Sequence, residues 1–160
     1  MQMELHSTVL TVLCLAVLGA DAVRSAPPVS AAPAKQYQID ARVFISGEAA
    51  RAKGGSGLTA LKPAERSMAS FLGYRDYKLL TSGTRSVKLN QPLTLSFTGG
   101  KSVSIIPVKD SDDRVTLEIK WDVKGDRWRK NLFFKRNSRT MVGGPKADGG
   151  GMYLLSVLVK

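Results

Sequence analysis

The sequence predicts a mainly β domain, either an antiparallel β-sandwich or a small barrel, with one short amphipathic helix. The clearest sign is the segment 115–123, in which apolar and polar residues alternate. Its apolar members are Val115, Leu117, Ile119, Trp121 and Val123. Strict alternation is typical of a strand with one buried face. Turn signals also recur about every 8–12 residues, the spacing of sandwiches and barrels, and we favour the sandwich.

The other strands are predicted from shorter runs of β-forming residues that turn residues separate. They are expected at 37–47, 74–80, 85–89, 93–97, 103–106, 127–136, 140–142 and 152–159. Ser82-Gly83 and Gly99-Gly100 are expected to form tight turns, and 143–151 a glycine-rich loop. Pro107 indicates a strand end or a sheet edge, because proline cannot donate a ladder hydrogen bond.

One segment carries a helical pattern, with apolar residues near helical spacing. These are Leu58, Leu61, Met68, Phe71 and Leu72. Pro63 suits a first helical turn and Gly73 a helix end, so we expect a helix near 62–72 that covers one face or end of a sheet. The preceding segment, 48–57, is charged and rich in Ala and Gly, and is expected to be a flexible loop.

The last strand, 153–159, is apolar on both of its faces. This pattern predicts a central strand that is buried on both sides. The alternative is a strand offered to another subunit by β-augmentation.

The first residues of the chain are typical of a targeting segment. Residues 7–20 are apolar and uncharged but too short to span a bilayer comfortably, which suits a secretory signal peptide over 1–22 with cleavage after Ala22. Glu4 and the lack of basic residues before the apolar run depart from the usual signal. The alternative is a buried N-terminal helix of a cytosolic domain. A Pro/Ala-rich linker over 23–36 favours export, with the β-rich domain following at 37–160.

Removal of the signal peptide changes the chemistry that is left. His6 and Cys14 are the only residues of their types and both precede Ala22, while the mature chain keeps 24 basic and 11 acidic residues, a net charge of +13. Thiol catalysis, histidine general-base catalysis and structural zinc sites are therefore excluded. Asp110, Asp112 and Asp113 fit a turn better than a catalytic pair. We expect no enzyme, no cofactor and no metal site.

The segment from Lys124 to Arg139 is basic and contains aromatic residues. Alternation along 127–136 places Arg127, Arg129, Asn131, Phe133 and Lys135 on one face. With Arg139, this basic stripe predicts a polyanion-binding surface made of Arg127, Arg129, Phe133, Lys135 and Arg139. An exported protein rarely meets nucleic acid, so we expect lipopolysaccharide, peptidoglycan or acidic polysaccharide. The alternative is that these cations only solvate an outer sheet face, partly neutralised by Glu118 and Asp122.

Three short patterns support a family resemblance. They are Ala41-Arg42-Val43-Phe44-Ile45, Tyr74-Arg75-Asp76-Tyr77-Lys78-Leu79 and Met141-Val142-Gly143-Gly144-Pro145 before an apolar last strand. The chain resembles small exported β-rich accessory proteins of Gram-negative envelope machines, such as gliding-motility or secretion apparatus. The resemblance implies a non-catalytic periplasmic subunit that binds envelope protein partners, with an extracellular location as the alternative. It implies no site residues. The polyanion-binding module remains the second hypothesis.

Overall fold

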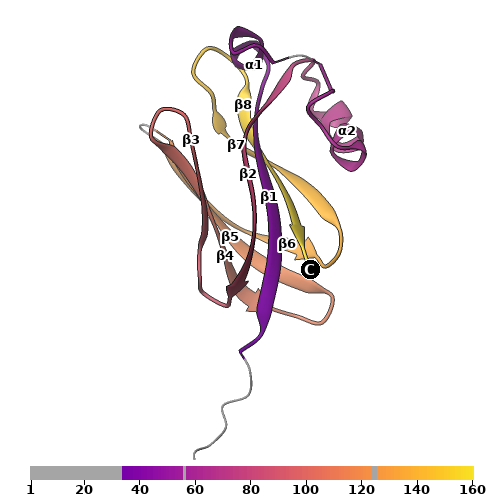
Figure 1. Cartoon of the computed structure of the whole chain (residues 1–160), viewed down its shortest axis with the longest axis vertical. Coiled ribbons are helices and arrows are strands. Elements are labelled where there is room, and N and C mark those ends of the chain that lie inside the picture. The colour runs from indigo at the N-terminus through magenta and orange to yellow at the C-terminus, as the bar shows by residue number, and fades with distance from the viewer. Residues whose placement is uncertain (1–33, 56, 124–125) are drawn as a thin grey trace, which may run out of the picture. The chain divides into compact units, whose positions relative to one another are not determined.

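The computed structural model describes residues 34–55, 57–123 and 126–160, without the side chains of 126 and 127. The predicted signal peptide and most of the predicted linker lie outside these residues, so both stay predictions. Within these ranges, eight strands form two separate four-stranded sheets (Figure 1). The first sheet holds, in order, β2 (Tyr77–Lys88), β1 (Gln36–Ser46), β8 (Met152–Val159) and β7 (Arg139–Lys146). The second holds β3 (Leu93–Phe97), β4 (Lys101–Asp110), β5 (Arg114–Val123) and β6 (Asp126–Lys135).

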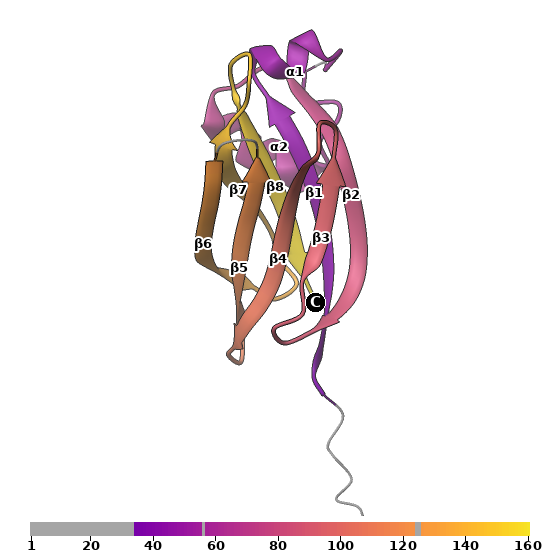
Figure 2. The same ribbon diagram turned by 90° about the vertical axis from the view of Figure 1, so that its left-hand side faces the viewer.

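The predicted β-sandwich is confirmed. All neighbouring strands in both sheets run antiparallel. Figure 2 shows the second sheet in front of the first. The apolar residues of the alternating segment 115–123 are buried between the sheets and contact the inward side chains of β1 and β8. The prediction for the last strand is also confirmed, because β8 lies between β1 and β7 and is buried on both faces.

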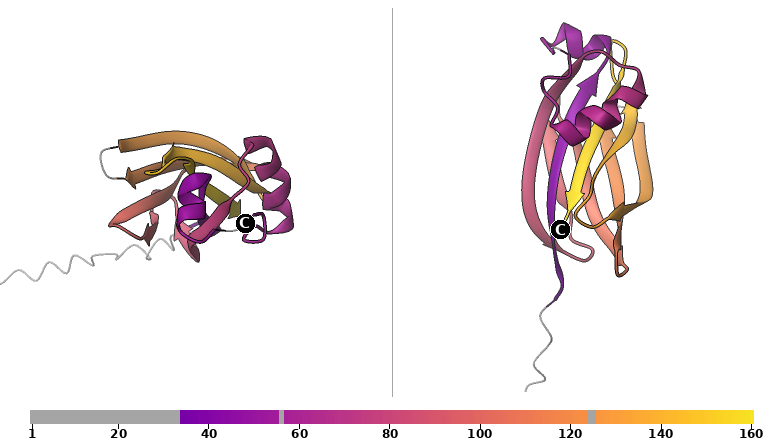
Figure 3. Two further views of the ribbon diagram at one scale, coloured as in Figure 1. Left: turned by 90° about the horizontal axis from the view of Figure 1, so that it is seen from above. Right: turned by 90° about the vertical axis from the view of Figure 1, so that its right-hand side faces the viewer.

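The predicted helix is confirmed as α2 (Pro63–Ala69), which continues into the 3₁₀ turn η1 (Ser70–Leu72) and ends at Gly73 in the left-handed conformation. It lies across the outer face of the first sheet (Figure 3). A second apolar cluster fills the space beneath it, with Phe44, Leu61, Ala69, Tyr77 and Leu154 buried. The predicted loop at 48–57 is partly wrong, since it begins with α1 (Glu48–Ala52).

The predicted turn at Ser82-Gly83 is wrong, because β2 runs through it without interruption. Gly83 pairs with Ala41 of β1 in register. A Cβ on Gly83 would lie 2.7 Å from the Leu95 side chain of the other sheet. The glycine therefore permits close packing between the sheets instead of a turn.

The predicted loop at 143–151 also starts too early. β7 continues through Gly143, Gly144 and Pro145 to Lys146. A Cβ on Gly144 would lie 2.7 Å from the indole ring of Trp121. A register irregularity between Gly143 and Lys146 accommodates the proline at this outer strand.

Candidate interaction face on the outer sheet

Strands β5 and β6 present one continuous surface to solvent. Since the odd-numbered residues of β5 face the core, its even-numbered residues face outward, together with their cross-strand partners on β6. Thr116 lies opposite Phe133, and Lys120 opposite Arg129. We call this surface the Phe133 face. Its described outward residues are Arg114, Thr116, Glu118, Lys120, Asp122, Arg129, Asn131, Phe133 and Lys135.

Phe133 is the most unusual residue of this surface. Its side chain is 73% exposed, whereas its neighbour Phe134 is 1% exposed and belongs to the core. The two aromatic rings differ because successive side chains of a strand point to opposite faces. Phe133 thus places a large apolar ring in solvent on a rigid, hydrogen-bonded strand.

The charges around Phe133 are of both signs and are largely paired. The Glu118 side chain is 7% exposed and forms ion pairs with Arg129 and with Lys120, the latter at 3.2 Å between Nζ and Oε2. At the end of β5, Arg114 Nε lies 3.5 Å from Asp113 Oδ2. Lys135, opposite Arg114, is exposed. The face therefore carries a mixed pattern of charge and not a uniformly basic stripe.

A hollow of about 480 Å³ adjoins the Phe133 face near the hairpin end of β5 and β6. It is lined by Lys120, Trp121, Asp122, Trp128 and Arg129. The Lys130 ammonium group lies 5.1 Å from the ring centre of Trp128. The indole N–H of Trp121 is buried and has no hydrogen-bond partner in the described part of the chain. Trp121 and Trp128 pair with each other on the core side of the sheet, so this hollow lies at the hairpin end and is not an extension of the Phe133 ring.

The structure brings together only some of the residues predicted for the polyanion surface. Arg129, Phe133 and Lys135 share the Phe133 face. The backbone of Arg127 pairs with Asp122, but its side chain lies outside the described residues. Arg139 does not join them, because β7 belongs to the other sheet.

Arg139 belongs instead to a buried polar cluster beneath α2. Its guanidinium forms ion pairs with Asp40 and Glu65, and its Nη1 donates a 3.0 Å hydrogen bond to the Ser156 hydroxyl. Arg42 also forms an ion pair with Glu65, whose side chain is fully buried. We call these five residues (Asp40, Arg42, Glu65, Arg139 and Ser156) the Glu65 network.

Sequence reasoning missed the Glu65 network. Asp40 and Arg42 occupy outward positions of the first strand, where charged residues are expected to face water. The one available signal was Glu65, at the third helical position, where its carboxylate accepts a 2.8 Å hydrogen bond from the Lys62 backbone N–H. The negative charges of Asp40 and Glu65 offset the positive charges of Arg42 and Arg139, so this cluster attaches α2 to the first sheet.

The aspartate group at 110–113 behaves as a turn, with Asp112 and Asp113 exposed. Asp110 forms ion pairs with Lys35 and Arg136. Burial alone would raise the pKa of Asp110, but hydrogen bonds from Lys35 and Arg136 outweigh it and hold the pKa below its ordinary value. Within the described residues, no three His, Cys, Asp or Glu side chains lie close enough to hold a metal ion.

Comparison with known proteins gives no further guide. No protein-family model, curated protein or solved structure matches this chain. Among the described residues, no helix is long and apolar enough to cross a membrane.

Proposed function

We propose that this protein is an exported, non-catalytic subunit that binds protein partners in a bacterial cell envelope, and that the Phe133 face is one of its docking surfaces. The observation that carries the proposal is the 73% exposure of Phe133 on the rigid outer face of β5 and β6. Protein interfaces are enriched in aromatic residues and arginine, and a few such side chains supply most of the binding energy. Phe133 and Arg129 are suited to that role.

The pairing of charges favours a protein partner over a polyanion. A polyanion site needs several cations that phosphates or carboxylates can reach. Here the Glu118 carboxylate is shared by Arg129 and Lys120, while Asp113 lies beside Arg114. An aromatic centre with a rim of mixed charges matches the composition of a protein interface instead.

Export and the periplasmic location rest on the sequence. The apolar segment before Ala22 and the Pro/Ala-rich linker support secretion. The gliding-motility or secretion machine is proposed from the resemblance described above, and an assembly or connector role follows from it.

A polyanion-binding module is the second candidate. It is supported by the net charge of +13 after cleavage at Ala22 and by the exposed cation of Lys135 beside Phe133. Binding of lipopolysaccharide or an acidic glycan would weaken steeply as salt is added.

A cross-linking pull-down of the tagged protein from fractionated native cells, washed at high salt, tests the two candidates. The variant is Phe133→Ser, and the matched control is Phe71→Ser, since Phe71 on η1 is 90% exposed but lies outside the Phe133 face. We expect a few stoichiometric envelope proteins with the wild type and Phe71→Ser, and their loss with Phe133→Ser. Equal recovery with Phe133→Ser would overturn the proposed face. Recovery of only glycan that salt removes would favour the second candidate.

A further inference from the structure

We propose that the free edge of β2 binds an extended, acidic segment of a protein partner as an added strand. This inference rests on the proposed protein-binding function but uses a different surface, on the other sheet from the Phe133 face. Two docking surfaces on different sheets would allow one domain to connect two partners.

The edge of β2 has the geometry that strand addition requires. β2 is the outermost strand of its sheet and, at 12 residues, the longest strand among the described residues. Its ladder partner is β1, with regular register from Thr81 to Lys88. Alternate backbone N–H and C=O groups of an outer strand point away from its partner and can pair with another extended chain.

The other three outer strands are less suited to this role. β3 has only five residues. β7 contains Pro145 and a register irregularity. β6 forms the Phe133 face, and its Arg129 is already paired with Glu118. β2 contains no proline and no acidic residue.

A groove beside one end of β2 provides side-chain recognition. It has a volume of about 430 Å³ and is lined by Lys53, Lys78, Leu79, Leu80 and Thr98. The two leucines supply an apolar surface, and the two lysines supply positive charge. The nearby Lys101 is already engaged, because its ammonium group donates 2.9 Å hydrogen bonds to Tyr153 and Asp148.

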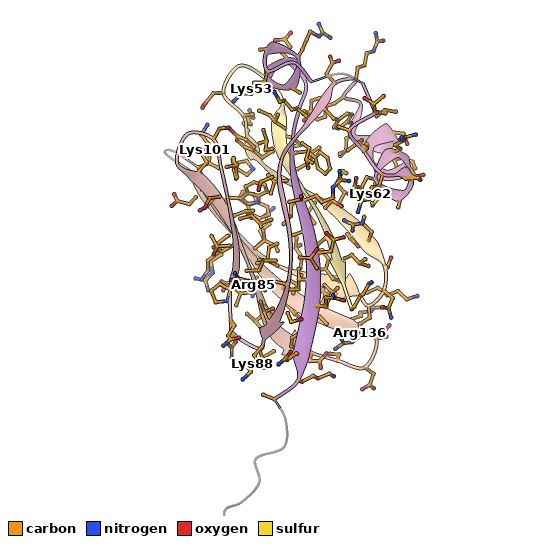
Figure 4. The ribbon with its side chains drawn as sticks, in the orientation of Figure 1. Lys53, Lys62, Arg85, Lys88, Lys101 and Arg136 are labelled. Carbon is orange, nitrogen blue, oxygen red and sulfur yellow. The ribbon has the colours of Figure 1, made fainter. Side chains whose placement is uncertain are left out.

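The charge of the edge selects the partner. Lys78, Arg85 and Lys88 lie along β2, and Arg85 and Lys88 are exposed. Figure 4 shows Lys53 near α1 and, toward the opposite end of β2, Arg85 and Lys88. Pairing of β2 with β2 of a second copy would bring like charges together, which is destabilising. An acidic extended segment would instead place its carboxylates near these cations.

The test uses a capped octapeptide of alternating Glu and Val as the probe and a Lys/Val octapeptide as its control. We expect the Glu/Val peptide, added to the ¹⁵N-labelled full chain, to shift the amide signals of residues 79–88 and to slow their hydrogen exchange. A Glu/Val peptide that is N-methylated at every residue keeps its charge but cannot donate backbone hydrogen bonds. It should therefore lose the effect.

Two variants complete the test. Arg85→Glu should weaken Glu/Val binding by about tenfold, since it places a carboxylate beside those of the peptide. Phe133→Ser should leave peptide binding unchanged. Equal binding of the N-methylated peptide, shifts centred on β6, or no shifts at a peptide concentration of about 1 mM would each overturn the β2 proposal. If the peptide does not bind β2 but Phe133→Ser loses its partners, the proposed function stays intact and only the β2 proposal is refuted. If the peptide binds β2 but Phe133→Ser keeps its partners, only the Phe133 face is refuted.

Discussion

The carboxylate of Glu65 on α2 accepts a 2.7 Å hydrogen bond from the hydroxyl of Ser156 on β8, although 91 residues separate them in the chain. Both side chains are fully buried. Arg42 and Arg139 approach the same carboxylate, so the helix is held on the sheet by a charge that water does not reach and two largely buried guanidinium groups. A buried carboxylate with two guanidinium partners has consequences for stability that substitution can measure.

Glu65→Gln should lower the free energy of unfolding by roughly 3–5 kcal/mol, because it leaves Arg42 and Arg139 with less than their compensating charge in a buried site. Urea denaturation followed by circular dichroism measures this change. The exposed Asp112→Asn is the control and should change stability by less than about 0.5 kcal/mol. A loss below about 1 kcal/mol for Glu65→Gln would contradict the assigned role of the network.

Gly144→Ala should destabilise the domain by about 1–3 kcal/mol, because the new methyl group overlaps the Trp121 ring at 2.7 Å. Gly143→Ala is a matched control on the same strand, since its nearest neighbour would be the flexible end of Met152 at 3.6 Å. Thermal melting, together with Trp fluorescence, separates the two variants. Equal stability of both would show that the sheets can move apart at little cost.

Phe133→Ala and Phe134→Ala form a pair of adjacent substitutions with opposite expected effects. Phe134→Ala removes a ring that is 1% exposed and should cost about 3–5 kcal/mol. Phe133→Ala removes a ring in solvent and should change stability by less than about 0.5 kcal/mol. Urea midpoints of the two variants test this expectation. A large loss for Phe133→Ala would mean that the ring has a packing role in the domain itself.

Stability should also depend on pH through Asp110. Because its pKa in the folded chain lies below the ordinary value of 3.8, its contribution is fully present above about pH 4 and is lost as the pH falls through the folded pKa. Asp110→Asn should therefore be less stable than the wild type by about 1 kcal/mol at pH 7. This difference should shrink as urea midpoints are measured at progressively lower pH. A difference that stays constant down to about pH 2 would exclude Asp110 as its source.

Much of the fold could be predicted because strand and helix periodicity are local properties. The alternation at 115–123 and the two-sided apolar run at 153–159 were enough to predict β5 and the central position of β8. The predictions that placed Gly83 in a turn and Gly144 in a loop are wrong for a physical reason. A glycine that forms a turn and a glycine that allows a bulky neighbour to approach look alike in sequence, and only Leu95 and Trp121 distinguish them.

The candidate site could be predicted only in part. Alternation within β6 correctly placed Arg129, Phe133 and Lys135 on one face, since that depends on one strand alone. The ion pairs of Arg129 depend on Glu118 of the next strand and could not be read from β6. Closeness in the chain places Arg139 with the predicted stripe, but the chain crosses to the other sheet at residues 136–138.

The sequence by itself determined the strand-rich class, the sandwich-like spacing of turns, the helix at 62–72 and the outward direction of Phe133. These features depend on side-chain order over a few residues. The tertiary structure decided which charges are paired, which glycines lie against aromatic rings, which strand edges are free, and that Glu65 is buried. These depend on contacts between residues far apart in the chain, which local periodicity does not encode.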